Sequence, residues 1–195
     1  MNDKIAFTSD QHYFHKNIIE LCNRPYKNIY EHNKKIISNY NEIIYDDSWD
    51  VYCLGDICYK CSANDAVTIL NKLNGKLHII LGNHDKPLRQ AIEKGMVNDL
   101  IEKGKLEIIG STDKNIMSAY QLKYQKYIFI LSHYAYRTWD RAFRGSIHLY
   151  GHSHNNLPPL FRSFDIGVDA NNFYPITINN VLKKANQIIQ EFSEK

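Results

Sequence analysis

The stretch Leu77-His78-Ile79-Ile80-Leu81-Gly82-Asn83-His84-Asp85 places an apolar strand directly before a turn that carries an amide, an imidazole and a carboxylate. Four other apolar runs, residues 4–9, 51–54, 127–132 and 147–150, end in the same way. The polar residues that follow these four runs are Asp10 and His12, Asp56, His133, and His152 and His154. Because active sites in α/β sheets are built from the ends of several strands, this recurrence predicts both the fold class and the place of the site.

The first half of the chain alternates these apolar runs with helical patterns. Helices are predicted over residues 14–22, 30–44, 62–74 and 87–95, from apolar spacing, from a capping-box pattern at Ser62 and from Pro87 at a helix start. The order β-α-β-α-β-α predicts a mostly parallel sheet with right-handed crossovers.

The second half is predicted to be mostly short strands. They fall near residues 105–109, 116–124, 127–132, 146–150 and 161–168, with a turn of helix around 137–143. A final amphipathic helix carries apolar residues from Val181 to Phe192. No linker, repeat or low-complexity segment divides the chain, so residues 1–195 are predicted to form a single domain.

The net charge of +3 is too small to indicate nucleic acid by itself and is compatible with an anionic substrate. No signal-peptide pattern and no apolar run long enough to cross a bilayer is present, so we expect a cytoplasmic protein without a membrane partner. No obligate protein partner is evident. The four cysteines are expected to be free thiols in a chain of this length.

Seven candidate metal ligands share oxygen or imidazole donors and include no thiolate: Asp10, His12, Asp56, Asn83, His133, His152 and His154. This mixture favours Mn²⁺, Fe or Zn²⁺ in a catalytic site over a structural zinc. Each motif alone also occurs in ordinary turns, so the prediction depends on all of them together. Seven ligands suit two divalent ions bridged by one carboxylate, with Mn²⁺ expected first. Two ions ~3.5–4 Å apart can activate a bridging hydroxide and hold phosphoryl oxygens, which predicts a phosphoesterase.

Taken as a series, these motifs resemble those of the calcineurin-like metallophosphoesterases over residues 5–154. Segments such as Asn23-Arg24-Pro25-Tyr26 further resemble small single-domain microbial and phage phosphoesterases. The resemblance implies an α/β fold, a four-layer α-β-β-α sandwich with two mixed β-sheets. It also implies that one ion is held by Asp10, His12, Asp56 and His154. The other would be held by Asp56, Asn83, His133 and His152, with Asp56 bridging.

The resemblance makes His84 the non-ligand histidine that faces the substrate and assists the leaving group, and Asp85 could orient its imidazole. Two positions depart from relatives. Tyr59 stands where many carry an acidic residue, and Lys60 stands where the protein-phosphatase branch carries arginine. These departures argue against phosphoprotein substrates.

Several assignments stay open at the level of sequence. Arg24 and His15 are candidates for contact with a substrate phosphate, with a solvated surface arginine as the alternative for Arg24. Asp165 and Asp169 either support histidine ligands or belong to ordinary strand-end turns. The substrate is expected to be a phosphomonoester or phosphodiester, including a nucleotide or nucleic acid. The alternatives are a nuclease or cyclic-nucleotide phosphodiesterase on the same centre, or a non-catalytic metal-binding module.

Overall fold

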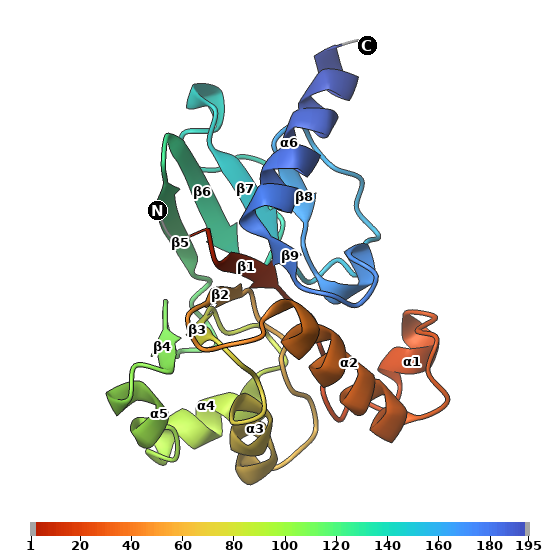
Figure 1. Ribbon diagram of the computed structural model, residues 1–195, viewed down its shortest axis with the longest axis vertical. Helices are drawn as coiled ribbons and strands as arrows, with labels where there is room; N and C mark the ends of the chain where they lie inside the picture. Colours follow the sequence, from red (N-terminus) through yellow and green to blue (C-terminus); the bar gives the residue numbers. More distant parts are fainter. Residues whose placement is uncertain (1–2, 194–195) are drawn as a thin grey trace.

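A computed structural model describes residues 3–193, which form two β-sheets packed face to face (Figure 1). The first sheet has the strand order β4-β3-β2-β1-β9. Its parallel strands are β1 (Ile5–Thr8), β2 (Asp50–Cys53), β3 (Lys76–Ile79) and β4 (Leu106–Ile108). The fifth strand, β9 (Ile176–Thr177), runs antiparallel to β1, so this sheet is mixed.

The second sheet is also mixed and has the strand order β5-β6-β7-β8. A hairpin joins β5 (Ala119–Tyr124) to β6 (Tyr127–Ser132). Parallel pairing then connects β6 to β7 (Ile147–Tyr150) and β7 to β8 (Ser163–Asp165). The alternation of side chains along these strands turns Phe129, Leu131 and Phe164 towards the first sheet.

Helices cover the outer face of the first sheet, in the lower half of Figure 1. They are α1 (Ile18–Leu21), α2 (Ile29–Ile43), α3 (Ala63–Leu70), α4 (Lys86–Glu93) and α5 (Asn98–Glu102). Local chemistry sets their starts: the Asn28 side chain caps α2, Ser62 and Asp65 form a capping box on α3, and a proline opens α4. One apolar core lies between these helices and the sheet.

A second apolar core fills the space between the two sheets and is closed at one side by α6 (Ile178–Ser193). Phe7 of β1 and Phe129 of β6 meet in it with ring centroids 5.9 Å apart. The outer face of the second sheet is covered by the loop that contains η1 (Ala142–Arg144), while η2 (Val168–Ala170) lies beside the end of β1. On this outer face of the second sheet, the His148 ring of β7 stacks with Tyr136 and with Trp139.

The predicted α/β fold with two mixed sheets flanked by helices is therefore confirmed. Two elements were absent from the sequence prediction, namely α5 and the two-residue strand β9, and the helix predicted over residues 14–22 is only the single turn α1. The four cysteines are free. In the part of the chain that is described, none of the helices has the combination of length and hydrophobicity that crossing a membrane requires.

Candidate metal centre

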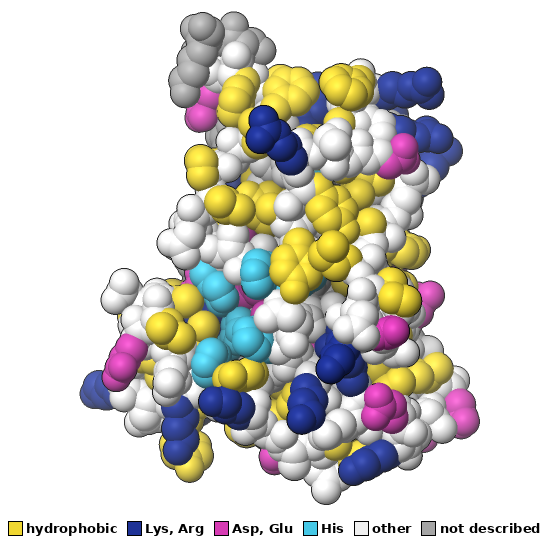
Figure 2. Space-filling model, turned by 180° about the vertical axis from the view of Figure 1, so that it is seen from behind, with side chains coloured by type: hydrophobic (Ala, Val, Ile, Leu, Met, Phe, Trp, Pro, Cys, Tyr) yellow, Lys and Arg dark blue, Asp and Glu magenta, His cyan; other side chains and the backbone are white. Residues whose placement is uncertain are grey.

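The predicted ligands follow strands that end at one edge of the sandwich. Register places Thr8 beside Cys53 and Cys53 beside Ile79, so the turns after β1, β2 and β3 are neighbours. Backbone hydrogen bonds fix these turns to one another, with the Asp10 and His12 amides donating to the carbonyls of Gly55 and Asp56 at 3.0 Å. The turns after β6 and β7 reach the same place, and Figure 2 shows the histidine side chains gathered in one patch on the surface.

Six of the seven ligand candidates form two groups. Asp10, His12 and His154 each offer one ligand atom within 4.8 Å of the others, and so do Asp56, His133 and His152. The seventh candidate, Asn83, joins the second group, because its Oδ1 lies 2.9 Å from His133 Nε2.

Asp56 stands between the two groups. Its Oδ2 lies 3.6 Å from His12 Nε2 and 3.4 Å from His133 Nε2, while its Oδ1 accepts a hydrogen bond from the His84 amide at 2.8 Å. A single carboxylate oxygen thus faces an imidazole nitrogen of each group. This is the arrangement that a bridging ligand requires.

Three atoms at this centre are buried and have no hydrogen-bond partner among the described residues: Asp10 Oδ1, His12 Nε2 and Asp56 Oδ2. A buried polar atom without a partner is costly, and a bound cation would satisfy all three. His133 Nδ1–H donates to the Leu54 carbonyl at 2.7 Å, which leaves Nε2 directed at the centre as a potential ligand. Carboxylate, imidazole and amide donors in this number fit a pair of divalent transition-metal ions.

The pKa values reflect the crowding of buried ligands. Burial raises the pKa of Asp10 to about 7. Burial also opposes ionisation of Asp56, but the close, positively charged His133 outweighs it and lowers the pKa of Asp56. Although burial works against the imidazolium form of His133, the Asp56 carboxylate raises its pKa to about 9. Protons therefore balance the carboxylates in the metal-free protein, and bound cations would displace them.

Five ligands adopt the left-handed backbone conformation. Their φ angles are 59° for Asp10, 54° for His12, 56° for Asp56, 65° for His152 and 47° for His154. This conformation is uncommon for residues with a Cβ atom and costs of order 1 kcal/mol or more each. Gly82 makes the close approach of the turns possible, because a Cβ atom there would lie 2.2 Å from Asp56 Oδ1.

Asp169 holds one histidine of the first ligand group in position. Its Oδ2 accepts a hydrogen bond from His154 Nδ1–H at 2.7 Å, which leaves His154 Nε2 for the metal side. Burial acts against the charged form of His154, but this hydrogen bond contributes to raising its pKa to about 10. Of the two roles weighed from sequence, Asp169 has the supporting one. Asp165 instead accepts hydrogen bonds from Ser153, Asn155 and Gly167 within its own turn.

Arg24 is buried, and all five of its N–H donors are used inside the protein. Nε and one terminal nitrogen donate to Asp169 at 2.9 and 2.7 Å, and the remaining donors reach the carbonyls of Asp10 and Gln11 and His32 Nε2. The guanidinium has no donor left for a substrate phosphate. We therefore correct the sequence-based assignment: Arg24 positions Asp169 and the Asp10 turn instead of contacting substrate.

Asp85 also has a different role from the predicted one. Its carboxylate accepts hydrogen bonds from the amides of Asp56, Ile57, Cys58 and Gly82 at 2.7–3.2 Å. These four bonds occupy both oxygens, so Asp85 does not orient the His84 imidazole as expected. It holds the backbone of the turn that presents Asp56.

His84 and His15 lie beside the two ligand groups without belonging to them. The His84 ring centroid is 5.4 Å from that of His12 and 6.2 Å from that of His15. Tyr59 packs on both histidines, at 4.6 and 4.3 Å. His84 also lines a pocket of about 440 Å³ together with Tyr59, Lys60, Cys61, Asn83, Lys86, Pro87 and Gln90. Sequence reasoning noted Tyr59 only as a departure from relatives and missed this contact, for which the sequence holds no local signal.

The chain is similar to known proteins in sequence and in structure, although no protein-family model matches it. The uncharacterised protein MJ1445 of Methanocaldococcus jannaschii is 32% identical over 188 residues, which cover 92% of this chain and 90% of that protein. The crystal structure of AQ665 from Aquifex aeolicus, a protein of unknown function, superposes with a TM-score of 0.62 at 19% identity. It covers 92% of this chain and 98% of that one, which supports the same α/β fold.

Proposed function

The chain belongs to the family of the Methanocaldococcus jannaschii protein MJ1445, and we propose that it is a dinuclear metal-dependent phosphoesterase of the calcineurin-like type. The observation that carries this proposal is the position of Asp56 Oδ2, 3.6 Å from His12 Nε2 and 3.4 Å from His133 Nε2. The unpartnered buried atoms Asp10 Oδ1 and His12 Nε2 of the first ligand group support the same conclusion.

When bound, a pair of divalent ions ~3.5–4 Å apart would activate a water molecule and neutralise charge on a phosphoryl group. One ion would be held by Asp10, His12, Asp56 and His154. The other would be held by Asp56, Asn83, His133 and His152. Mn²⁺ is the expected metal, with Fe or Zn²⁺ as further candidates for this donor set.

The residues around the ligands supply the rest of the chemistry. His84 is the candidate general acid, because it lines the pocket next to Asn83 and is not needed as a ligand. Lys60 and Lys86 line the same pocket and offer positive charge to an anionic substrate. The Nδ1 atom of His15 lies 3.2 Å from that of His12. His15 remains a proposed contact for the substrate phosphate.

A turnover screen tests the proposal. Protein reconstituted with Mn²⁺ is assayed on phosphomonoesters, phosphodiesters and nucleotides, with Asp56→Ala as the matched variant that lacks the shared carboxylate. Hydrolysis of at least one ester by the wild-type protein and its loss in Asp56→Ala are expected. Protein that holds two ions per chain and hydrolyses none of these esters would favour a non-catalytic metal-binding module.

A further inference from the structure

A groove on the outer side of the second sheet combines aromatic rings with most of the excess positive charge of the chain. Residues 134–162 contain four arginines, namely Arg137, Arg141, Arg144 and Arg162, against one acidic residue, Asp140. The net charge of this segment is therefore +3, the same as that of the whole chain.

The groove consists of two adjoining pockets of about 570 and 460 Å³, which share Arg137 and Leu160. We call them together the arginine-aromatic groove. Trp139, Phe143 and Phe161 line the larger pocket. Phe143 is fully exposed, at 101% of its reference area, and Phe161 is 40% exposed. One fully exposed and one partly exposed aromatic ring beside a concave surface indicate a place where another apolar or flat group binds.

Arginine side chains are positioned around these rings. The Arg162 guanidinium lies 5.1 Å from the Phe161 ring centroid, and Arg162 Nε is buried with no hydrogen-bond partner in the described part of the chain. Arg137 lines both pockets. Arg141 has an ion pair with Asp140 at 3.6 Å, in which both side chains are largely exposed. The groove thus offers cationic donors and π-faces side by side.

The smaller pocket begins next to the metal centre. Ala135 and Tyr150 line it, and each stands two residues from a ligand, His133 and His152 respectively. Tyr134, the residue before Ala135, has its ring 4.6 Å from that of His152. Figure 2 shows hydrophobic side chains extending from the histidine patch over the same face, with Lys and Arg side chains beside them.

We propose that the arginine-aromatic groove binds single-stranded nucleic acid and leads it to the metal centre. Bases would stack on Phe143, Phe161 and Trp139, while phosphates pair with Arg137 and Arg162. A single strand is required because a paired base is already stacked on its neighbours and presents no free face. An anionic membrane is the alternative occupant, and the vesicle experiment below distinguishes it from a nucleic acid. Hydrolysis of this strand at the metal centre rests on the proposed phosphoesterase function.

The binding half is tested without catalysis. A fluorescein-labelled thymidine 12-mer of single-stranded DNA is titrated with the protein in EDTA, and fluorescence anisotropy gives Kd over a series of salt concentrations. Phe143→Ala should weaken binding about 5- to 150-fold without changing the salt dependence, because stacking carries no charge. Arg137→Ala should reduce the slope of log K against log salt by about 0.7, the value for one phosphate contact on a single strand.

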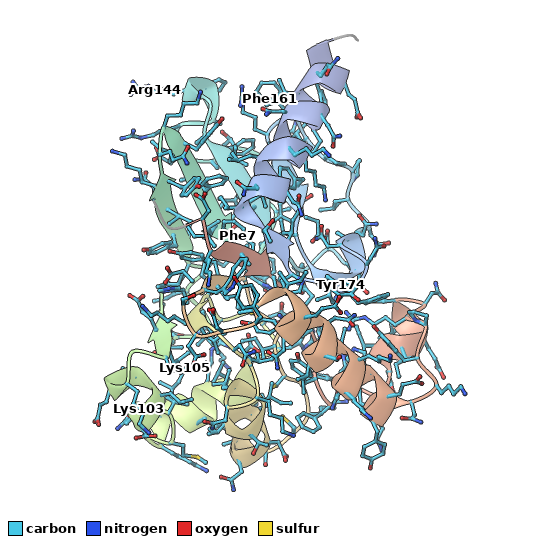
Figure 3. The ribbon with its side chains drawn as sticks, viewed as in Figure 1. Phe7, Lys103, Lys105, Arg144, Phe161 and Tyr174 are labelled. Atoms are coloured by element: carbon cyan, nitrogen blue, oxygen red, sulfur yellow. The ribbon has the colours of Figure 1, made fainter. Side chains whose placement is uncertain are left out.

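Two matched controls lie away from the groove. Tyr30→Ala removes another exposed aromatic ring, 82% exposed on α2, and Lys103→Ala removes an exposed cation at the C-terminal end of α5. Figure 3 shows Lys103 at the opposite end of the molecule from Arg144 and Phe161. Both controls should bind the 12-mer like the wild-type protein. Equal losses in the control and groove variants would overturn the proposal, and so would the absence of binding at low salt.

Further outcomes separate this proposal from the proposed function. Hydrolysis of bis(p-nitrophenyl) phosphate with Mn²⁺ but no binding of the 12-mer would overturn the groove and leave the phosphoesterase intact. Binding of the 12-mer without hydrolysis of any ester would leave the groove and overturn the phosphoesterase. Preferential binding of phosphatidylserine vesicles, lost in Phe143→Ala, would overturn nucleic acid in favour of a membrane surface.

Discussion

Replacing Arg24 by alanine should destabilise the protein strongly. In the folded chain its guanidinium donates two hydrogen bonds to the Asp169 carboxylate and further ones to the carbonyls of Asp10 and Gln11. Its side chain is completely buried, at 0% exposed, and that of Asp169 is 7% exposed. Arg24→Ala would therefore remove one of the two cationic partners of a buried carboxylate and leave His154 as the other.

The expected magnitude follows from these contacts. Removing one partner of a buried ion pair costs about 3–5 kcal/mol. For a domain of this size each kcal/mol lowers Tm by about 2–4 °C, so Arg24→Ala should melt about 6–20 °C below the wild-type protein. Because Asp169 orients His154, metal affinity at the first ligand group should also fall, by about 10- to 100-fold.

Differential scanning calorimetry in EDTA measures the loss of stability separately from the loss of metal. The control is Arg144→Ala, at the surface, where a change within about 2 °C is expected. The reasoning would be refuted by an Arg24→Ala protein that melts like the wild type and only turns over substrate more slowly. That result would indicate that the Arg24 guanidinium contacts a substrate phosphate.

Three further predictions concern the metals, the general acid and acid stability. Elemental analysis after Mn²⁺ reconstitution should find close to two ions per chain, and Asp56→Ala should reduce the occupancy of both sites. One ion in the wild type, or unchanged occupancy in the variant, would contradict the shared carboxylate. His84→Ala should keep both ions and lose ~10²–10⁴ in rate on a nucleoside ester but much less on a nitrophenyl ester, whose leaving group needs no proton. Equal losses on the two esters would instead indicate that His84 positions the phosphate. Burial lowers the pKa of His148 from 6.5 to about 4. Because the unfolded chain takes up the proton first, about 3 kcal/mol of folding stability that is present above pH 6.5 should be lost as the pH falls towards 4. Urea unfolding at several pH values measures this loss, and His148→Gln should flatten it. An unchanged pH dependence in that variant would assign the acid sensitivity to other groups.

That the candidate ligands lie together could be predicted from sequence, because each one follows an apolar strand and strand ends in a parallel sheet meet at one edge. The two mixed sheets were implied by the resemblance to the calcineurin-like metallophosphoesterases, whereas the strand pattern alone predicted only a parallel α/β half followed by a half of short strands. By contrast, β9 has two residues, and its pairing with β1 joins segments about 170 residues apart. Nothing local in Ile176–Thr177 distinguishes it from a loop.

The supporting residues were harder to assign for the same reason. Arg24 and Asp169 are 145 positions apart, so their contact depends on the finished fold. Asp85 was expected to act on its neighbour His84, yet its carboxylate reaches back to backbone amides near Asp56. Sequence proximity indicated the correct region in each case, but the partner was set by packing.

The left-handed backbone at Asp10, His12, Asp56, His152 and His154 has a consequence for directed evolution of this protein. Glycine at such positions relieves backbone strain while it removes the side chain of a candidate metal ligand. A library selected for heat resistance alone, in the presence of a chelator, should therefore accumulate these replacements at the ligand positions. Selection for stability would then remove the proposed metal centre. A screen for more stable variants of this chain therefore has to measure metal binding from its first round.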